Sequence, residues 1–187
     1  MSTASAWSVA LNGIEGAMVE VEVAEGGGLP RTVLVGLPDA ALSQAKERVR
    51  AAVTGAELPW PNGLVTINLS PANLPKTGTH YDLAIATAAL AAIDKVPKEA
   101  ARNHVCLGEL GLDGRLRRVP GILPALLAAV RSGFDKVIVP ASQEAEASLV
   151  PGITVWAIGH LKDLVAVLNG EPPLGGWEPP ADEDVAS

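Results

Sequence analysis

The residue types best suited to chemistry in this sequence lie between positions 68 and 83. Ser70, His80 and Asp82 could act as nucleophile, base and orienting carboxylate, because a serine hydroxyl is a weak nucleophile until a neighbouring base takes its proton. In a tight loop, however, such side chains more often bond the backbone and fix the turn. We therefore expect a structural role for these three residues.

Lys76 lies in the same segment and has two possible roles. Its ammonium group could bind a phosphate, or it could simply be solvated. The second interpretation is favoured, because a single lysine on a polar loop is usually a surface residue.

Two groups of basic residues are candidates for contacts with DNA or with another subunit. The denser group is Arg115, Arg117 and Arg118. It fits a contact patch and a charged strand edge that resists aggregation equally well. The second group lies on a predicted helix, where a solvated surface is favoured, and consists of Lys46, Arg48 and Arg50.

The composition predicts one globular domain. The chain has 187 residues, of which 48% are hydrophobic and 19% charged, while aromatic residues make up only 3%. The core must therefore consist of Ala, Val, Leu and Ile. The net charge of −7 opposes non-specific binding to nucleic acid by the chain as a whole, so any DNA contact needs a local basic patch.

Cysteine and histidine are too few for a disulfide or a zinc site. Cys106 is the one cysteine and the chain has three histidines, which gives no zinc-ligand spacing. Cys106 lies in an apolar run and is predicted to be a small buried hydrophobic residue. No metal is expected.

The sequence also lacks targeting signals. Its N-terminus has neither a basic start nor a long apolar core, so no signal peptide is predicted. No apolar stretch reaches the length of a membrane span. A cytoplasmic location without membrane contact is the expectation.

The first half of the chain is predicted to form strands at 7–11, 17–24, 32–35 and 65–69. In the second of these, Val19, Val21 and Val23 alternate with glutamates, which is typical of a sheet with one solvated face. Pro38 is predicted to open a helix over 39–54 that ends at Gly55. A loop over 70–80 precedes an almost wholly apolar helix over 82–92, which must lie in the core.

The second half is predicted to contain a strand over 105–112, a two-residue turn at Asp113-Gly114 and a returning strand over 115–119. Helices follow at 120–131, at 142–148 with Ser142 as N-cap, and at 161–168, with strands at 136–139 and 153–158. This order predicts an α/β or α+β fold with helices packed on a mixed sheet. The sequence from Gly170 onward is rich in Pro and Gly and then acidic, so we expect a domain over 1–170 and a linker over 171–187.

Four segments together resemble the N-terminal domain of the ComM/YifB family of magnesium-chelatase-like ATPases. They are Val35-Gly36-Leu37-Pro38-Asp39, Lys46-Glu47-Arg48-Val49-Arg50, residues 68–83 and residues 108–121. They occur in the family's order, and the resemblance extends from about residue 7 to 170. The departures are Ser70, Asn73 and Ala84, where the family more often has Ala, Asp and Pro.

The resemblance implies a Lon-protease-like fold, also described as ribosomal protein S5 domain 2-like. Lon cleaves peptides with a serine that a lysine activates. In this sequence His80 falls at the serine position and Leu123 at the lysine position, and a leucine cannot accept a proton. The resemblance therefore implies a domain without peptidase chemistry, in which the family-motif loop is Pro75, Lys76, Gly78, His80, Tyr81 and Asp82.

The resemblance also implies a longer protein in which a linker leads to an AAA+ module that binds ATP and Mg. Such proteins resemble hexameric helicases that drive DNA branch migration in recombination and natural transformation. Because this chain lacks a Gly-x-x-x-x-Gly-Lys-Ser/Thr motif, no cofactor is expected in it. Its implied role is an accessory layer that helps oligomerisation or grips DNA. The alternatives are a Lon-type Ser-Lys peptidase and a subunit of a magnesium-chelatase-like complex.

Overall fold

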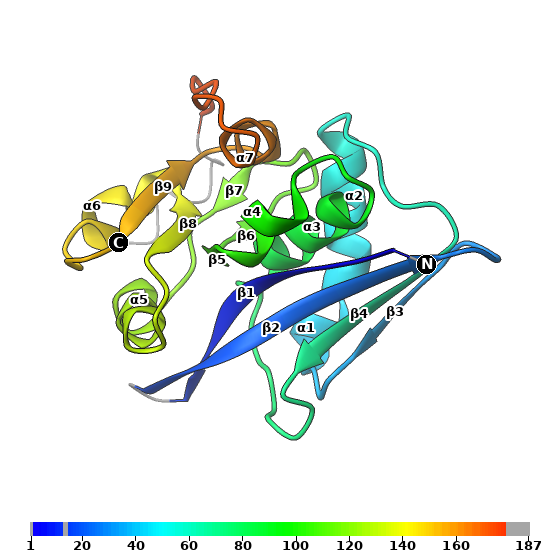
Figure 1. The fold of residues 1–187 in the computed structure, drawn as a ribbon, viewed down its shortest axis with the longest axis horizontal. Coiled ribbons are helices and arrows are strands. Elements are labelled where there is room, and N and C mark those ends of the chain that lie inside the picture. Colours follow the sequence, from blue (N-terminus) through cyan, green and yellow to red (C-terminus); the bar gives the residue numbers. More distant parts are fainter. Residues whose placement is uncertain (1, 13–14, 179–187) are drawn as a thin grey trace.

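A seven-stranded mixed sheet organises the chain in the computed structural model, which describes residues 2–12 and 15–178 (Figure 1). The strand order is β3-β4-β2-β1-β5-β8-β9. The pairs β1–β2 and β2–β4 are antiparallel, and the other four pairs are parallel. The strands are β1 (Ser2–Asn12), β2 (Glu15–Gly26), β3 (Arg31–Val35), β4 (Leu64–Ser70), β5 (Val105–Cys106), β8 (Lys136–Pro140) and β9 (Thr154–Ile158). A separate hairpin joins β6 (Glu109–Leu110) to β7 (Leu116–Arg117).

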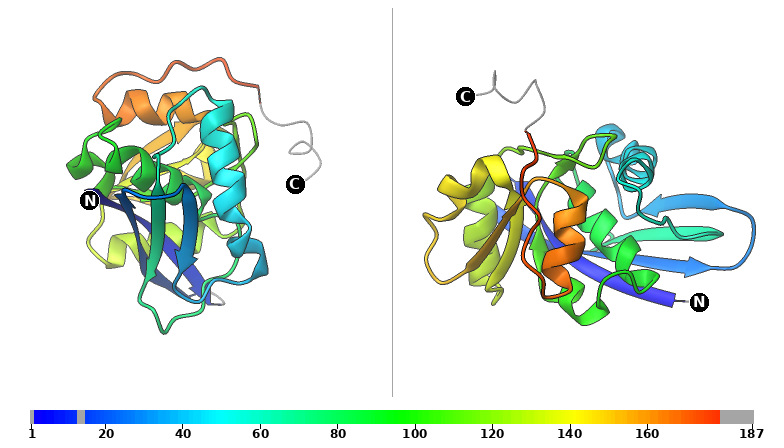
Figure 2. Two further views of the ribbon diagram at one scale, coloured as in Figure 1. Left: turned by 90° about the vertical axis from the view of Figure 1, so that its right-hand side faces the viewer. Right: turned by 90° about the horizontal axis from the view of Figure 1, so that it is seen from above.

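Helices pack against both faces of the sheet. They are α1 (Ala40–Ser43), α2 (Ala45–Gly55), α3 (Asp82–Ala92), α4 (Lys98–Arg102), α5 (Ile122–Arg131), α6 (Glu144–Ala147) and α7 (Leu161–Leu168), with a 3-10 turn η1 (Ala141–Gln143). Figure 2 shows α7 on one side of β8 and β9, with α5 and α6 on the other. The fold class expected from the sequence, helices packed on a mixed α/β sheet, is confirmed.

Two hydrophobic cores result from this arrangement, one on each face. Along β8, Ile138 packs into the larger core with α2, α3 and α7, whereas Val137 and Val139 pack into the second core with α5 and α6. Successive strand residues point to opposite faces, so a continuous apolar strand supplies both cores. Cys106 is fully buried in the larger core, as predicted, and burial raises the pKa of its thiol to about 12.

The alternation in β2 and the apolar helix α3 are confirmed. Val19, Val21 and Val23 are completely buried, while Glu20 and Glu22 between them are at least partly exposed. All eleven residues of α3 are buried, because the helix lies under the β1–β2 hairpin and carries no polar face.

Several predicted boundaries are wrong. The helix expected over 39–54 is two helices that meet at Gln44, and Asp39 rather than Pro38 begins it, since the Asp39 carboxylate accepts the Leu42 N–H at 2.7 Å. Ser142 is not an N-cap, because the turn there is anchored instead by the Gln143 amide, which exchanges two hydrogen bonds with the backbone of Val119.

The strand expected over 105–112 is interrupted at Gly108. The Gly108 carbonyl accepts the Leu83 N–H and its own N–H donates to the His80 carbonyl, so this residue pairs with the start of α3 rather than with a strand. The hairpin itself exists, but its turn is longer than the predicted Asp113-Gly114, because the Gly114 N–H donates to the Gly111 carbonyl. Strand β7 is correspondingly only two residues long.

Residues 171–178 form no helix or strand, yet they are bound to the domain. The buried Asp163 carboxylate accepts the backbone N–H groups of Leu174 at 2.7 Å and Gly175 at 3.3 Å. The Trp177 ring stacks on His160 with ring centroids 3.9 Å apart. The acidic remainder of the expected linker, residues 179–187, lies outside the described residues. Within the described part of the chain, no helix combines the length and apolar character that crossing a membrane requires.

Candidate functional site

The four motif segments, which lie far apart in the sequence, meet at one place between α2, α3 and β4. We call this cluster the motif junction and define it as residues 36–39, Arg48, residues 76–82 and residues 108–110. Its backbone links include Asp39 N–H to Lys76 O at 2.9 Å and Lys76 N–H to Leu37 O at 3.0 Å. The Thr79 hydroxyl donates to the Glu109 carboxylate at 3.0 Å.

Lys76 is completely buried at the centre of this junction. Its ammonium group donates to the carbonyls of Gly36 at 2.7 Å and Leu69 at 3.1 Å, and to that of Pro71. Gly36 has φ 116°, and a Cβ there would collide with the Leu69 carbonyl. The lysine therefore joins three backbone segments. Both sequence interpretations, a phosphate cation and a solvated residue, are wrong.

Arg48 and Asp82 form the ionic part of the junction. The guanidinium group donates to both carboxylate oxygens, at 2.6 and 2.7 Å, and the Leu110 N–H donates to the same carboxylate at 3.0 Å. Desolvation raises the pKa of Asp82 to about 6, and the hydrogen bonds from Arg48 and Leu110 oppose that rise. An apolar helix that opens with an aspartate was the available signal for this pair, since a buried carboxylate needs a partner.

His80 and Tyr81 are both buried and lie against each other, with ring centroids 4.1 Å apart. The His80 Nε2 atom is 2.7 Å from the Val9 carbonyl, so it carries the proton in this contact. Burial lowers the pKa of His80 and raises that of Tyr81. His80 is thereby tied to β1.

Ser70, His80 and Asp82 are not arranged as a catalytic set. His80 bonds the Val9 carbonyl, Asp82 pairs with Arg48, and the Ser70 hydroxyl accepts the Asn68 amide at 3.3 Å. Leu123, at the other position that matters for Lon-type chemistry, packs against the second core. His80 and Asp82 bond the backbone as expected, but at Val9 and Leu110 rather than within their own loop, and Ser70 contacts the Asn68 side chain. That these three residues have no catalytic role stays a prediction.

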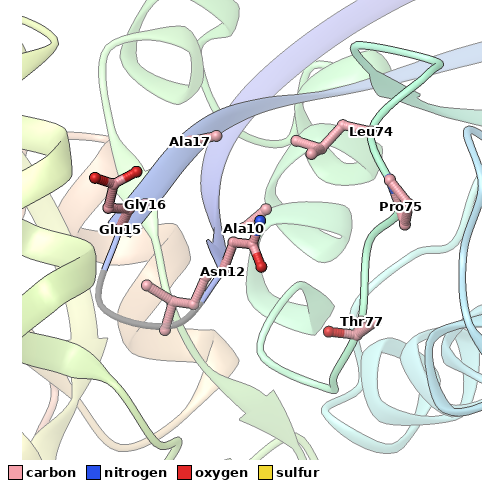
Figure 3. A pocket seen from close by; sticks show the side chains of 9 residues that line it. Ala10, Asn12, Glu15, Gly16, Ala17, Leu74, Pro75 and Thr77 are labelled. Carbon is pink, nitrogen blue, oxygen red and sulfur yellow. The ribbon is translucent and has the colours of Figure 1, made fainter.

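A pocket of about 290 Å³ lies beside the motif junction (Figure 3). Its walls are the end of the β1–β2 hairpin, with Asn12 and Glu15, and the motif loop, with Leu74, Pro75 and Thr77. Figure 3 shows the Leu74 and Thr77 side chains extending from the loop toward the hairpin, while Lys76 is buried. Family-motif residues therefore line the pocket without offering it a charged group from the loop.

The arginines of the hairpin are half-buried. The Arg115 guanidinium donates to the Asp113 carboxylate at 2.7 Å and to the Glu178 carbonyl at 3.2 Å. Arg117 lies opposite Glu109 in the hairpin register. Arg115 thus contacts the segment 171–178, and whether these arginines with Arg118 contact DNA or a subunit stays a prediction.

The three basic residues of α2 do not form one patch. Arg48 faces α3 in its ion pair with Asp82, so the expectation that it lies on the solvated surface is wrong. Arg50 is exposed and lines a different pocket with Arg31, and Lys46 is half-exposed. Residues two apart on a helix point in nearly opposite directions, which separates Arg48 from its neighbours.

Within the described residues, no group of three or more His, Cys, Asp or Glu side chains could hold a metal ion.

Comparison with known proteins shows what the chain is similar to. The sequence profile of subunit ChlI of Mg-chelatase matches residues 19–143. An uncharacterized protein of Mycobacterium tuberculosis is 50% identical over 182 residues, which cover 97% of this chain and 36% of that protein. Competence protein ComM of Haemophilus influenzae is 40% identical over 175 residues, which cover 93% of this chain and 34% of that protein. The chain therefore spans about a third of the length of these curated relatives.

A more distant similarity supports the fold. Lon protease 2 of Bacillus subtilis is 30% identical over 105 residues, which cover 55% of this chain and 18% of that protein. Both the resemblance to ComM and the Lon-like fold expected from the motifs are confirmed.

Proposed function

Because the chain belongs to the family of subunit ChlI of Mg-chelatase, with ComM among its relatives, we propose that it is the accessory, non-catalytic domain of a longer ComM/YifB-type AAA+ ATPase. In this proposal, the ATPase module binds ATP and Mg, assembles as a hexamer and moves DNA branches during recombination and transformation in the cytoplasm. The present domain helps the subunits assemble and engages DNA.

The observation that carries the proposal is the use of the motif loop inside the fold. Lys76 bonds three carbonyls, His80 bonds the Val9 carbonyl, and Asp82 pairs with Arg48. Groups committed to such bonds cannot also transfer protons to a substrate without breaking the core. This supports a motif that holds the domain in one shape rather than a motif that performs catalysis.

The experiment compares the longer protein with a version that lacks residues 1–170. Native mass spectrometry reports the number of subunits, and ATP hydrolysis is measured with and without branched DNA. The proposal expects a smaller assembly or a weaker response to DNA when the domain is removed, while some basal hydrolysis remains. An unchanged assembly with an unchanged DNA response would contradict the proposed role.

A Lon-type peptidase is the first rival. The relative named Lon protease 2 motivates it, whereas His80 and Leu123 at the two key positions speak against it. If this rival is right, the 187-residue chain must cleave casein faster than a heat-denatured sample of the same chain does. The second rival is a chelatase subunit, which the family description motivates. It would require the longer protein to stimulate insertion of magnesium into a porphyrin.

A further inference from the structure

A second pocket, of about 210 Å³, lies between the start of β3, helix α2 and the segment 60–63. Its polar lining side chains are Arg31, Thr32, Arg50, Thr54 and Asn62, and Trp60 provides an aromatic wall. The backbone holds the two sides together, because the Arg31 N–H donates to the Gly63 carbonyl at 3.1 Å. Arg50 and Thr54 lie four residues apart and so share one side of α2.

The charge of this pocket is unusual for the chain. The net charge is −7, yet among the described residues two arginines and no carboxylate line the pocket. Both arginines are exposed, and neither forms an ion pair within residues 2–12 and 15–178, unlike Arg48 and Arg115, which do. Their positive charge is therefore available to an anion.

The side chains fit the parts of a nucleotide. Arginine binds phosphate through two parallel N–H donors, and the Thr54 hydroxyl and Asn62 amide can add hydrogen bonds. Trp60 is only partly buried against the larger core, and an indole face stacks on a nucleic-acid base of any sequence once that base is unpaired. Two guanidinium groups beside one indole thus match one phosphate and one base.

The pocket is smaller than the usual pocket for a drug-sized ligand. Pockets for drug-sized ligands commonly enclose about 300–1,000 Å³, and this pocket encloses about 210 Å³. We propose that Arg31, Arg50 and Trp60 bind a nucleotide unit of single-stranded nucleic acid. This inference rests on the DNA engagement included in the proposed function and assigns it to a pocket whose lining does not include Arg115, Arg117 or Arg118.

The test measures binding of a fluorescent oligothymidylate to the 187-residue chain by anisotropy at several salt concentrations. The double variant Arg31→Gln with Arg50→Gln is expected to bind about tenfold more weakly. The slope of log K against log salt should fall by about 0.7, which is the contribution of one lost phosphate contact with a single strand. The matched control is Arg102→Gln with Arg131→Gln, which removes the same charge from two exposed arginines outside this pocket and should change the affinity little.

Trp60 tests the stacking part separately. Trp60→Leu keeps an apolar side chain against the core and loses the ring, so it should weaken binding. Trp60→Phe keeps a smaller ring and should weaken it less. Unfolding curves of both variants confirm that the domain is folded.

The outcomes separate the site from the function. Equal binding by the pocket variant and the control would overturn the site, while the proposed DNA engagement would survive if both still bound. If the unaltered chain bound no oligonucleotide, the site and the DNA engagement by this domain would both fall. If thymidine monophosphate or inorganic phosphate bound through both arginines as tightly as the oligonucleotide, the nucleic-acid assignment would be overturned in favour of a free phosphate ligand.

Discussion

Arg48 of α2 and Asp82 of α3, 34 positions apart in the sequence, form a two-fold hydrogen-bonded ion pair with N–O distances of 2.6 and 2.7 Å. The aspartate side chain is completely buried and the arginine side chain is 18% exposed. The pair connects two of the four motif segments and places α2 against the core helix. It also explains why an otherwise apolar helix begins with a carboxylate.

The variant Arg48→Met is expected to lower the free energy of unfolding by about 3–5 kcal/mol at neutral pH, since it leaves a buried carboxylate without a charged partner. Burial raises the pKa of Asp82, and removing the arginine raises it further. Protonation then stabilises the folded state, so the loss should shrink as the pH falls. Urea unfolding at several pH values measures it.

The double variant Arg48→Met with Asp82→Asn provides the control for that experiment. An asparagine can still accept the Leu110 N–H, so much of the lost stability should return. If Arg48→Met alone were as stable as the unaltered chain, the ion pair would contribute nothing to the stability of the fold.

Much of the fold follows from the sequence because it depends on local patterns. The alternation of Val19, Val21 and Val23 predicts a half-exposed strand, and the uninterrupted apolar run predicts α3. The roles of Arg48 and Lys76 depend instead on partners brought together by the folded chain. Each residue looks like a surface cation in the sequence, and only the meeting of four segments reveals the carboxylate and the three carbonyls that bind them.

Several element boundaries could not be predicted from the sequence for the same reason. Gly108 leaves its expected strand because Leu83 and His80 offer it backbone partners, and no local pattern encodes that contact. Residues 171–178 look like a linker by composition, yet Asp163 and His160 hold them. The pocket of Arg31 and Arg50 was likewise missed, because these residues lie 19 positions apart and on different elements.

The variant Lys76→Met tests whether the buried lysine holds the motif loop. It keeps most of the side-chain volume and removes the donor to three carbonyls, so we expect a loss of about 2–4 kcal/mol in the free energy of unfolding. The loop over 70–80 should also become more sensitive to protease. Thr77→Ala, at the exposed neighbouring position, should change stability by less than about 0.5 kcal/mol. Equal effects of the two changes would refute the special role of Lys76.

His160 should make stability depend on pH. Its Nδ1 atom accepts the Lys162 N–H at 3.0 Å and its Nε2 atom donates to the Asp113 carbonyl at 2.9 Å, which requires the neutral ring. Desolvation lowers its folded pKa below 6.5, so its contribution is complete above about pH 6.5 and is lost as the pH falls through the folded pKa.

The variant His160→Asn keeps a capping acceptor and cannot titrate. Thermal unfolding from about pH 7 to pH 5 should therefore show a smaller loss of stability than in the unaltered chain. Part of the loss should remain, because burial also lowers the pKa values of His80 and His104. Identical pH profiles for the two proteins would show that His160 does not contribute to the pH dependence of stability.

Asp163 is predicted to hold residues 171–178 against the domain. Asp163→Ala removes the acceptor of the Leu174 and Gly175 N–H groups. Protease should therefore cleave within that segment faster than it could if cleavage required unfolding of the whole domain. Asp135→Ala, at a carboxylate whose side chain is 74% exposed, serves as the control. Cleavage at the same rate in both variants would mean that the two hydrogen bonds do not retain the segment.

The most direct test of the proposed accessory role is the mass of the native protein in a cell lysate, detected with an antibody raised against this domain. The chain alone has a mass of 19.2 kDa, and it covers 36% of its Mycobacterium tuberculosis relative. The account predicts a band near three times 19.2 kDa, which would then be purified for DNA-stimulated ATP hydrolysis. A single band at 19.2 kDa would contradict it, because the domain would then act without an ATPase module on the same chain.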